Sequence, residues 1–196
     1  MIKIMYIDDS IDLAIGDCLS EFAANNTDIE YSEEEFTPEK NYEDLVKKVK
    51  EENVNILIID SKLYTTDSKG KKYTGEEFRV ILKHFFPFIE TLVVTQNDIS
   101  GPGIIKKFDS ESNKEIEINQ YYNKYLIEEI KNKKLQIEFS RNLLKQIESN
   151  KTLDENTIQK IALSLSNDDS YQELKVEDID KLIKNFNELK RLIENG

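Results

Sequence analysis

The chain has 196 residues with 38% hydrophobic and 34% charged side chains, which suits one domain with an appendage or two small domains. Its net charge of −12 disfavours non-specific binding to nucleic-acid backbones, while its single cysteine and single histidine exclude an internal disulfide and a Cys/His zinc site. The sequence contains neither an apolar run long enough to span a membrane nor a signal-peptide pattern, so we expect a cytoplasmic protein without membrane partners.

Short apolar runs alternate with amphipathic segments in the first half of the chain. The apolar run over 2–7 predicts a strand buried on both faces, and the helical spacing of apolar residues over 11–25 predicts a helix after it. The next segments predict a short strand over 29–31, an acidic loop over 33–35 and a helix over 38–52.

The strongest strand pattern covers 54–59, which is apolar and rich in β-branched residues. A later helix is expected to end before Pro87, because proline disfavours a helical conformation in the residue that precedes it. The segments after the strong strand predict a polar loop, a helix, a strand, a turn and a last short strand, over 67–75, 74–86, 91–95, 96–103 and 104–108.

The repeated order of strand and helix predicts an α/β fold with a right-handed, doubly wound parallel sheet. In the second half the strand patterns disappear, and helices are predicted over 118–149, 152–165 and 176–194. We therefore expect a domain over 1–117 and an all-helical C-terminal extension over 118–196. The extension is not basic, which argues against a DNA-binding output, and its amphipathic helices are candidates for a homodimer contact.

Acidic and polar residues stand where the predicted strands end. Asp8 and Asp9 follow the first strand, Asp60 follows the third, and Thr95 ends the fourth. Ligands of such sheets bind beyond the carboxyl ends of the strands, so we expect these side chains to converge at one edge. Three carboxylates in one place repel each other unless a cation joins them, and Mg²⁺ suits a site built only from oxygen ligands.

This arrangement resembles the receiver domain of two-component response regulators. The matching residues are the Asp8-Asp9 pair, Asp60, Thr95 and Lys106 in the string IIKKF, and the resemblance covers about the first 109 residues. It implies a five-stranded, flavodoxin-like fold with a phosphoacceptor at its carboxyl edge.

The resemblance also implies a role for each matching residue. Asp60 would accept a phosphoryl group, and Mg²⁺ would be held by Asp60, the adjacent aspartate pair and the backbone carbonyl of Lys62. Thr95 would bond a phosphoryl oxygen, and Lys106 would pair with the acyl phosphate, with Lys107 as the competing lysine. The segment from Thr95 to Lys106 is too short for the helix that the family has there, so we expect that helix to be shortened or missing.

These features predict a phosphoacceptor signalling protein that takes a phosphoryl group from a histidine kinase or phosphotransfer protein. It would regulate a protein partner without binding nucleic acid, and it would not be a conventional enzyme. The alternative is a receiver-like interaction module that works without phosphorylation, whose acids are remnants or a simple cation site. A separate, purely structural interpretation makes Asp8 and Asp9 turn or helix-capping residues. A metal-dependent phosphatase is less consistent with the sequence, because no Asp-x-Asp string follows a strand. Cys18 and His84 are expected to be structural.

Overall fold

The computed structural model describes residues 1–37, 39–64, 73–98, 100–113, 116–149 and 158. The helices predicted over 152–165 and 176–194 therefore lie outside the described residues, apart from Ile158. No helix in the part of the chain that is described has the length and apolar character needed to cross a membrane.

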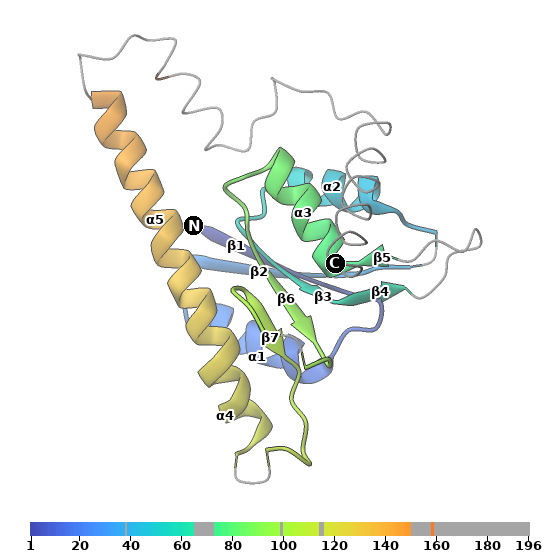
Figure 1. Cartoon of the computed structure of the whole chain (residues 1–196). Helices are drawn as coiled ribbons and strands as arrows, with labels where there is room; N and C mark the ends of the chain where they lie inside the picture. The colour runs from blue at the N-terminus through green and yellow to red at the C-terminus, as the bar shows by residue number, and fades with distance from the viewer. Residues whose placement is uncertain (38, 65–72, 99, 114–115, 150–157, 159–196) are drawn as a thin grey trace, which may run out of the picture.

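Five parallel strands form the central sheet in the order β2-β1-β3-β6-β7 (Figure 1). Their bounds are Ile2–Asp8 for β1, Ile29–Glu35 for β2, Ile56–Asp60 for β3, Glu90–Thr95 for β6 and Ile104–Lys106 for β7. Numbered within this sheet alone, the order is that of flavodoxin-like doubly wound folds. The predicted fold class is confirmed.

Helices cover both faces of the sheet, and the alternation of side chains along each strand supplies both cores. Met5 and Ile7 of β1 pack beneath α2 (Tyr42–Glu51) and α3 (Gly75–Phe85). Ile4 and Tyr6 of the same strand pack on the opposite face, beneath α1 (Leu13–Ala24) and the long C-terminal helix. Because a strand turns successive side chains to opposite faces, an almost wholly apolar strand is what a sheet covered on both sides requires.

The long helix follows the last strand and closes the second core. It runs through α4 (Ile118–Tyr122), a π-helical turn, η1 (Asn123–Ile127), and α5 (Glu128–Ser149), as predicted for 118–149. Its buried residues are Tyr121, Tyr122, Leu126, Ile127, Ile130 and Ile137. The core of the α/β domain thus continues past residue 117, the predicted end of that domain.

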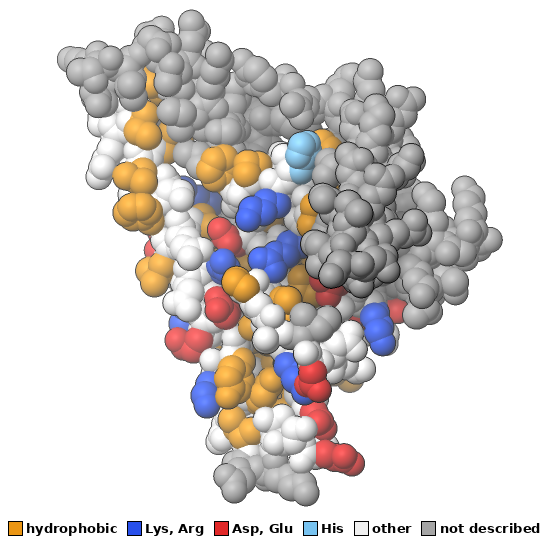
Figure 2. Space-filling view, viewed as in Figure 1, with side chains coloured by type: hydrophobic (Ala, Val, Ile, Leu, Met, Phe, Trp, Pro, Cys, Tyr) orange, Lys and Arg blue, Asp and Glu red, His pale blue; other side chains and the backbone are white. Residues whose placement is uncertain are grey.

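Helix α5 carries large apolar side chains on its outer face, visible along the helix in Figure 2. They lie at a spacing of four residues and are Leu135, Phe139 and Leu143, with exposed fractions of 63%, 64% and 41%.

Two segments differ from the sequence-based prediction. The prediction of an acidic loop over 33–35 is wrong, because β2 continues through Glu35, which pairs with Asp8 of β1. After Asp60, β4 (Lys62–Tyr64) pairs antiparallel with β5 (Tyr73–Thr74), and β5 falls within the polar loop predicted over 67–75. The part of that loop over 67–72 lies outside the described residues. Between β6 and β7 the described residues form no helix, as the short spacing predicted.

Candidate metal and phosphoacceptor site

Three carboxylates meet at the carboxyl edge of the sheet. Asp8 ends β1, Asp9 follows it, and Asp60 ends the neighbouring strand β3, where Ile7 is in register with Ile59. One ligand oxygen from each aspartate lies within 4.8 Å of the other two. The predicted convergence of these acids is therefore what the fold produces, and the acidic cluster is compatible with a metal site.

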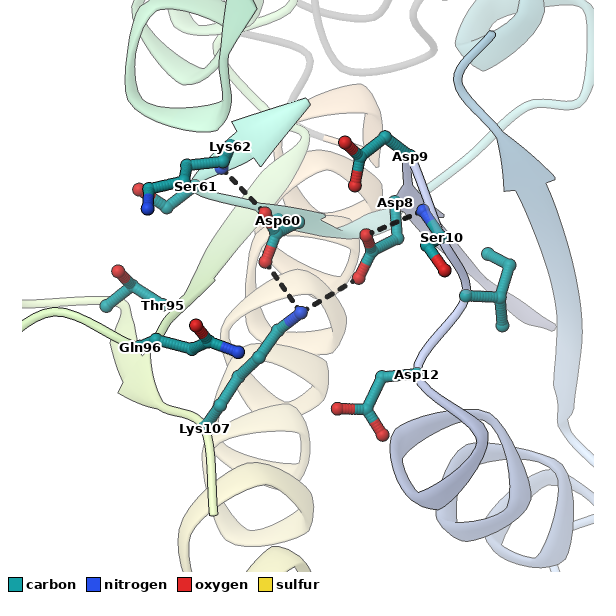
Figure 3. A pocket seen from close by; sticks show the side chains of 11 residues that line it. Asp8, Asp9, Ser10, Asp12, Asp60, Ser61, Lys62, Thr95, Gln96 and Lys107 are labelled. Carbon is teal, nitrogen blue, oxygen red and sulfur yellow. Dashed lines mark hydrogen bonds and ion pairs between the residues drawn. The ribbon is translucent and has the colours of Figure 1, made fainter. Parts of the chain in front are cut away.

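The carboxylates line an open pocket of about 420 Å³ that is bordered by the ends of four strands (Figure 3). Lys62 and Thr95, both predicted at this site, also line it. The pocket is large enough to admit a phosphoryl group with its metal and water ligands.

Lys107 reaches into this pocket and joins two of the acids. Its Nζ lies 2.8 Å from Oδ1 of Asp60 and 3.0 Å from Oδ2 of Asp8 (Figure 3). Burial alone would favour the neutral amine, but the contacts with Asp60 and Asp8 outweigh it and raise the pKa of Lys107 above its ordinary value. The ammonium group therefore stays charged between the two carboxylates.

Lys106, the lysine that the resemblance assigned to this role, lies elsewhere. Its ammonium group pairs with the exposed carboxylate of Asp98, and it is in register with Thr95 as the last residue of β7. Because side chains alternate along a strand, Lys107 turns to the same side as the buried Ile105, and Lys106 turns away. The structure thus brings the competing lysine, Lys107, to the carboxylates.

Asp60 is held from two directions. One side-chain oxygen, Oδ2, accepts a hydrogen bond of 2.6 Å from the backbone N–H of Lys62, which leaves Oδ1 directed at Lys107. Helix α3 begins directly against the Asp60 backbone, where a Cβ on Gly75 would lie only 2.4 Å from the Asp60 carbonyl oxygen. Burial raises the pKa of the Asp60 carboxyl, and the neighbouring ammonium group of Lys107 counteracts that rise.

Tyr6 is a site residue that the sequence analysis did not identify. It is fully buried, and its hydroxyl donates a hydrogen bond to Oδ2 of Asp8 while accepting one of 3.4 Å from the backbone N–H of Asp12. The other Asp8 oxygen, Oδ1, accepts a hydrogen bond of 3.1 Å from the Ser10 N–H. The available signal was spacing: Tyr6 and Asp8 are two positions apart on a strand and therefore share a face.

Asp9 is the more accessible member of the aspartate pair. Burial, together with the nearby Asp8 and Asp60, raises the pKa of Asp9 to about 6. Among the described residues, one ammonium group, that of Lys107, contacts this cluster of three carboxylates, so negative charge is in excess there. A divalent cation with a preference for oxygen ligands fits such a donor set, and Asp8, Asp9 and Asp60 are the side chains that would hold it.

Thr95 supplies a buried hydroxyl beside the pocket. Its side chain is only 1% exposed, and its Oγ1 accepts a hydrogen bond of 3.1 Å from the Asn97 N–H. The hydroxyl proton is a hydrogen-bond donor in its own right, so Thr95 can serve an anion at the edge of the pocket.

Comparisons with known proteins complete this description. No model of a known protein family matches the chain, and a search of curated proteins finds no match. Among solved structures, the chain is similar to RcsB from Salmonella enterica serovar Typhimurium, bound to promoter rprA in the presence of phosphomimetic BeF3−. That likeness has 16% sequence identity and a TM-score of 0.40, and it covers 93% of this chain and 98% of the other.

The fold assignment rests on the strand order and on the position of the acids at the carboxyl edge. The sheet and the acidic cluster fit a receiver domain. Chemically, this edge combines a buried carboxylate, an adjacent excess of negative charge for a cation, a fixed ammonium group and a hydroxyl. These are the parts that transfer of a phosphoryl group to a carboxylate requires, because that reaction depends on positioning and charge stabilisation.

Proposed function

We propose that this protein is a phosphoacceptor signalling protein of the two-component type, in which Asp60 takes a phosphoryl group in the presence of Mg²⁺. The observation that carries the proposal is the meeting of Asp8, Asp9 and Asp60 within 4.8 Å, with Lys107 in contact with two of them. A sheet edge that only ended in turns would have no need to bury two carboxylates beside a lysine.

The transfer proceeds by displacement at phosphorus. An oxygen of Asp60 forms a bond to phosphorus while the bond from phosphorus to the donor's imidazole nitrogen breaks, and the imidazole leaves with the electron pair. Lys107 stabilises negative charge on the transferred group, and the Thr95 hydroxyl donates to one of its oxygens. Bound Mg²⁺ would neutralise charge on the incoming phosphoryl group, held by Asp8, Asp9 and Asp60 with the carbonyl of Lys62.

The donor in this proposal is a histidine kinase or phosphotransfer protein, and the protein that responds is a partner rather than DNA. The net charge of −12 supports a protein partner, because it disfavours approach to phosphate backbones. Phosphorylation would add about −1.5 to −2 charge units to an edge that is already negative, which is enough to reorder the loops around it. A cytoplasmic site of action, the absence of conventional enzyme activity and a homodimer through the C-terminal helices remain predictions.

Intact mass measurement tests the proposal directly. The full chain is incubated with Mg²⁺ and a small acyl- or amido-phosphate donor, and we expect a gain of one phosphoryl group. Asp60→Asn should abolish the gain, whereas Asp98→Asn, which changes an exposed aspartate at the next strand end, should retain it. A wild-type protein that gains nothing with several donors would contradict phosphoacceptance and favour the phosphorylation-independent interaction module.

A further inference from the structure

Two tyrosines of the long helix bond the backbone on either side of Lys107. The hydroxyl of Tyr121 donates a hydrogen bond of 3.0 Å to the carbonyl oxygen of Lys106. The hydroxyl of Tyr122 accepts a hydrogen bond of 3.1 Å from the backbone N–H of Phe108. The side chains of Tyr121 and Tyr122 are only 7% and 1% exposed, so both hydroxyls act from within the second core.

The backbone of Lys107 itself is bonded on its other side. Its N–H donates a hydrogen bond of 2.6 Å to the carbonyl oxygen of Thr95, at the end of β6. Strand β7 ends at Lys106, so Lys107 lies just outside it. The segment 106–108 is therefore held by hydrogen bonds to β6 on one side and to the start of the long helix on the other.

We propose that Tyr121 and Tyr122 are positioning residues that hold the backbone around Lys107 so that its ammonium group reaches Asp60 and Asp8. A lysine side chain loses much rotamer freedom when its end is fixed, and a fixed backbone reduces the additional freedom that must be lost. The functional importance of this arrangement rests on the proposed role of Lys107 in phosphoryl transfer, but the arrangement itself can be tested without phosphorylation.

Aromatic packing allows the hydroxyl groups to be tested separately from the rings. The Tyr121 ring packs against Phe108 and Tyr122 at centroid distances of 5.5 Å and against Tyr125 at 4.7 Å. Phenylalanine at 121 and 122 keeps these ring contacts and removes only the hydrogen bonds. Tyr125 supplies a matched control, because its ring belongs to the same cluster while its side chain is 42% exposed.

The experiment measures how fast a small acylating reagent modifies each lysine of the full chain, resolved by peptide mass spectrometry in the absence of phosphoryl donor. In wild type, Lys107 should react much more slowly than the exposed Lys106. The double variant Y121F/Y122F should raise the rate at Lys107 about fivefold, corresponding to the loss of one or two ordinary hydrogen bonds. Y125F should leave that rate at the wild-type value.

Lys134 reports on general loosening of the fold, because it pairs with Asp28 at the opposite edge of the sheet. An increase at Lys107 with an unchanged rate at Lys134 supports the proposal. An unchanged Lys107 rate overturns it, and so does an equal increase at both lysines, because that result shows only a less stable fold.

The same variants distinguish this inference from the proposed function. If wild type takes up a phosphoryl group, Y121F/Y122F should slow the uptake, and the slowing should disappear when Lys107→Met is present in both proteins. Slowing that persists without Lys107 would overturn the positioning role. If wild type takes up none while the labelling result holds, the proposed function fails and the positioning of Lys107 stands.

Discussion

The two edges of the sheet organise charge in different ways. At the amino edge, three carboxylates pair with lysines and the pairs are partly exposed: Lys3–Glu52, Lys133–Glu90 and Lys134–Asp28, at 2.8, 2.9 and 2.6 Å. At the carboxyl edge, Asp8, Asp9 and Asp60 form one cluster in which Lys107 contacts Asp8 and Asp60, and two of the three carboxylates are buried.

The two edges therefore carry different electrostatic costs. Partly exposed pairs of opposite charge are balanced, and each contributes little to stability. Buried charges lose hydration, and an excess of one sign adds repulsion. The carboxyl edge combines both costs, as the proposed binding of a cation and a phosphoryl group would require.

Replacing Lys107 should change the free energy of unfolding more than any other substitution considered for the two edges. Lys107→Met removes the ammonium group that contacts two buried carboxylates, so we expect the free energy of unfolding to fall by about 3–5 kcal/mol without added divalent ion. Added Mg²⁺ should recover part of the loss, because a ligand that binds only the folded state stabilises it. Urea unfolding with and without Mg²⁺ measures both effects.

The adjacent lysine is the control. Lys106→Met removes an ion pair whose lysine and aspartate side chains are 39% and 89% exposed, so the unfolding free energy should change by no more than about 0.5 kcal/mol. If both methionine variants lost the same stability, the buried cluster would be energetically no different from a surface pair, and the contrast between the edges would fail.

Tyr6→Phe should have the next largest effect. It removes a buried hydroxyl that donates to Asp8 and accepts from the Asp12 N–H, so we expect a loss of about 1–3 kcal/mol of unfolding free energy. Since the hydroxyl also fixes one oxygen of Asp8, the affinity for Mg²⁺ should fall as well. Calorimetric titration with Mg²⁺ and urea unfolding measure the two quantities separately.

Tyr31→Phe provides the comparison for Tyr6. The Tyr31 hydroxyl donates to Glu33 at 2.6 Å on the edge strand β2, away from the carboxylate cluster. Its removal should leave Mg²⁺ affinity unchanged. Equal losses of affinity in both variants would mean that Tyr6 acts through general stability and not through Asp8.

The sequence was sufficient for the fold and for the meeting of the acids. Buried parallel strands are nearly wholly apolar, and Asp8 and Asp60 follow two such strands, so the general rule for sheet edges brought them together. The family's helix between β6 and β7 was expected to be shortened or missing because of the short spacing between Thr95 and Lys106, and the described residues there form no helix.

The choice between the two lysines and the role of Tyr6 depended on details that a single sequence does not supply. Ile104 and Ile105 are both apolar, so their pattern did not reveal which face Lys106 and Lys107 would take. Tyr6 stands in an apolar run and resembles an ordinary core residue until the Asp8 carboxylate is placed against its hydroxyl. Side chains are known to alternate between the two faces of a strand, but which residue takes which face is fixed only by the strand register.

Replacing Glu52, a carboxylate at the amino edge, should have a smaller effect on stability than replacing Lys107 or Tyr6, and it tests the amino-edge half of the comparison. Although burial opposes it, hydrogen bonds from Lys3, Lys48 and Ser32 lower the pKa of Glu52 to about 2. A carboxyl whose pKa is lower in the folded state stabilises the fold above its unfolded pKa, and this stabilisation is lost as the pH falls toward the folded value. Glu52→Gln should therefore lower the free energy of unfolding by about 1 kcal/mol at pH 7.

The difference in unfolding free energy between wild type and Glu52→Gln should shrink as the pH falls from about 4.5, the ordinary pKa of glutamate, toward about 2. Urea midpoints at pH 7 and in this acidic range measure it. Glu51→Gln is the matched control. The Glu51 side chain is 59% exposed and lies 3.8 Å from the Lys47 ammonium nitrogen, so its replacement should change the unfolding free energy little at every pH. A Glu52 difference that persisted unchanged down to pH 2 would show that the amino edge is held by packing and not by its ion pairs.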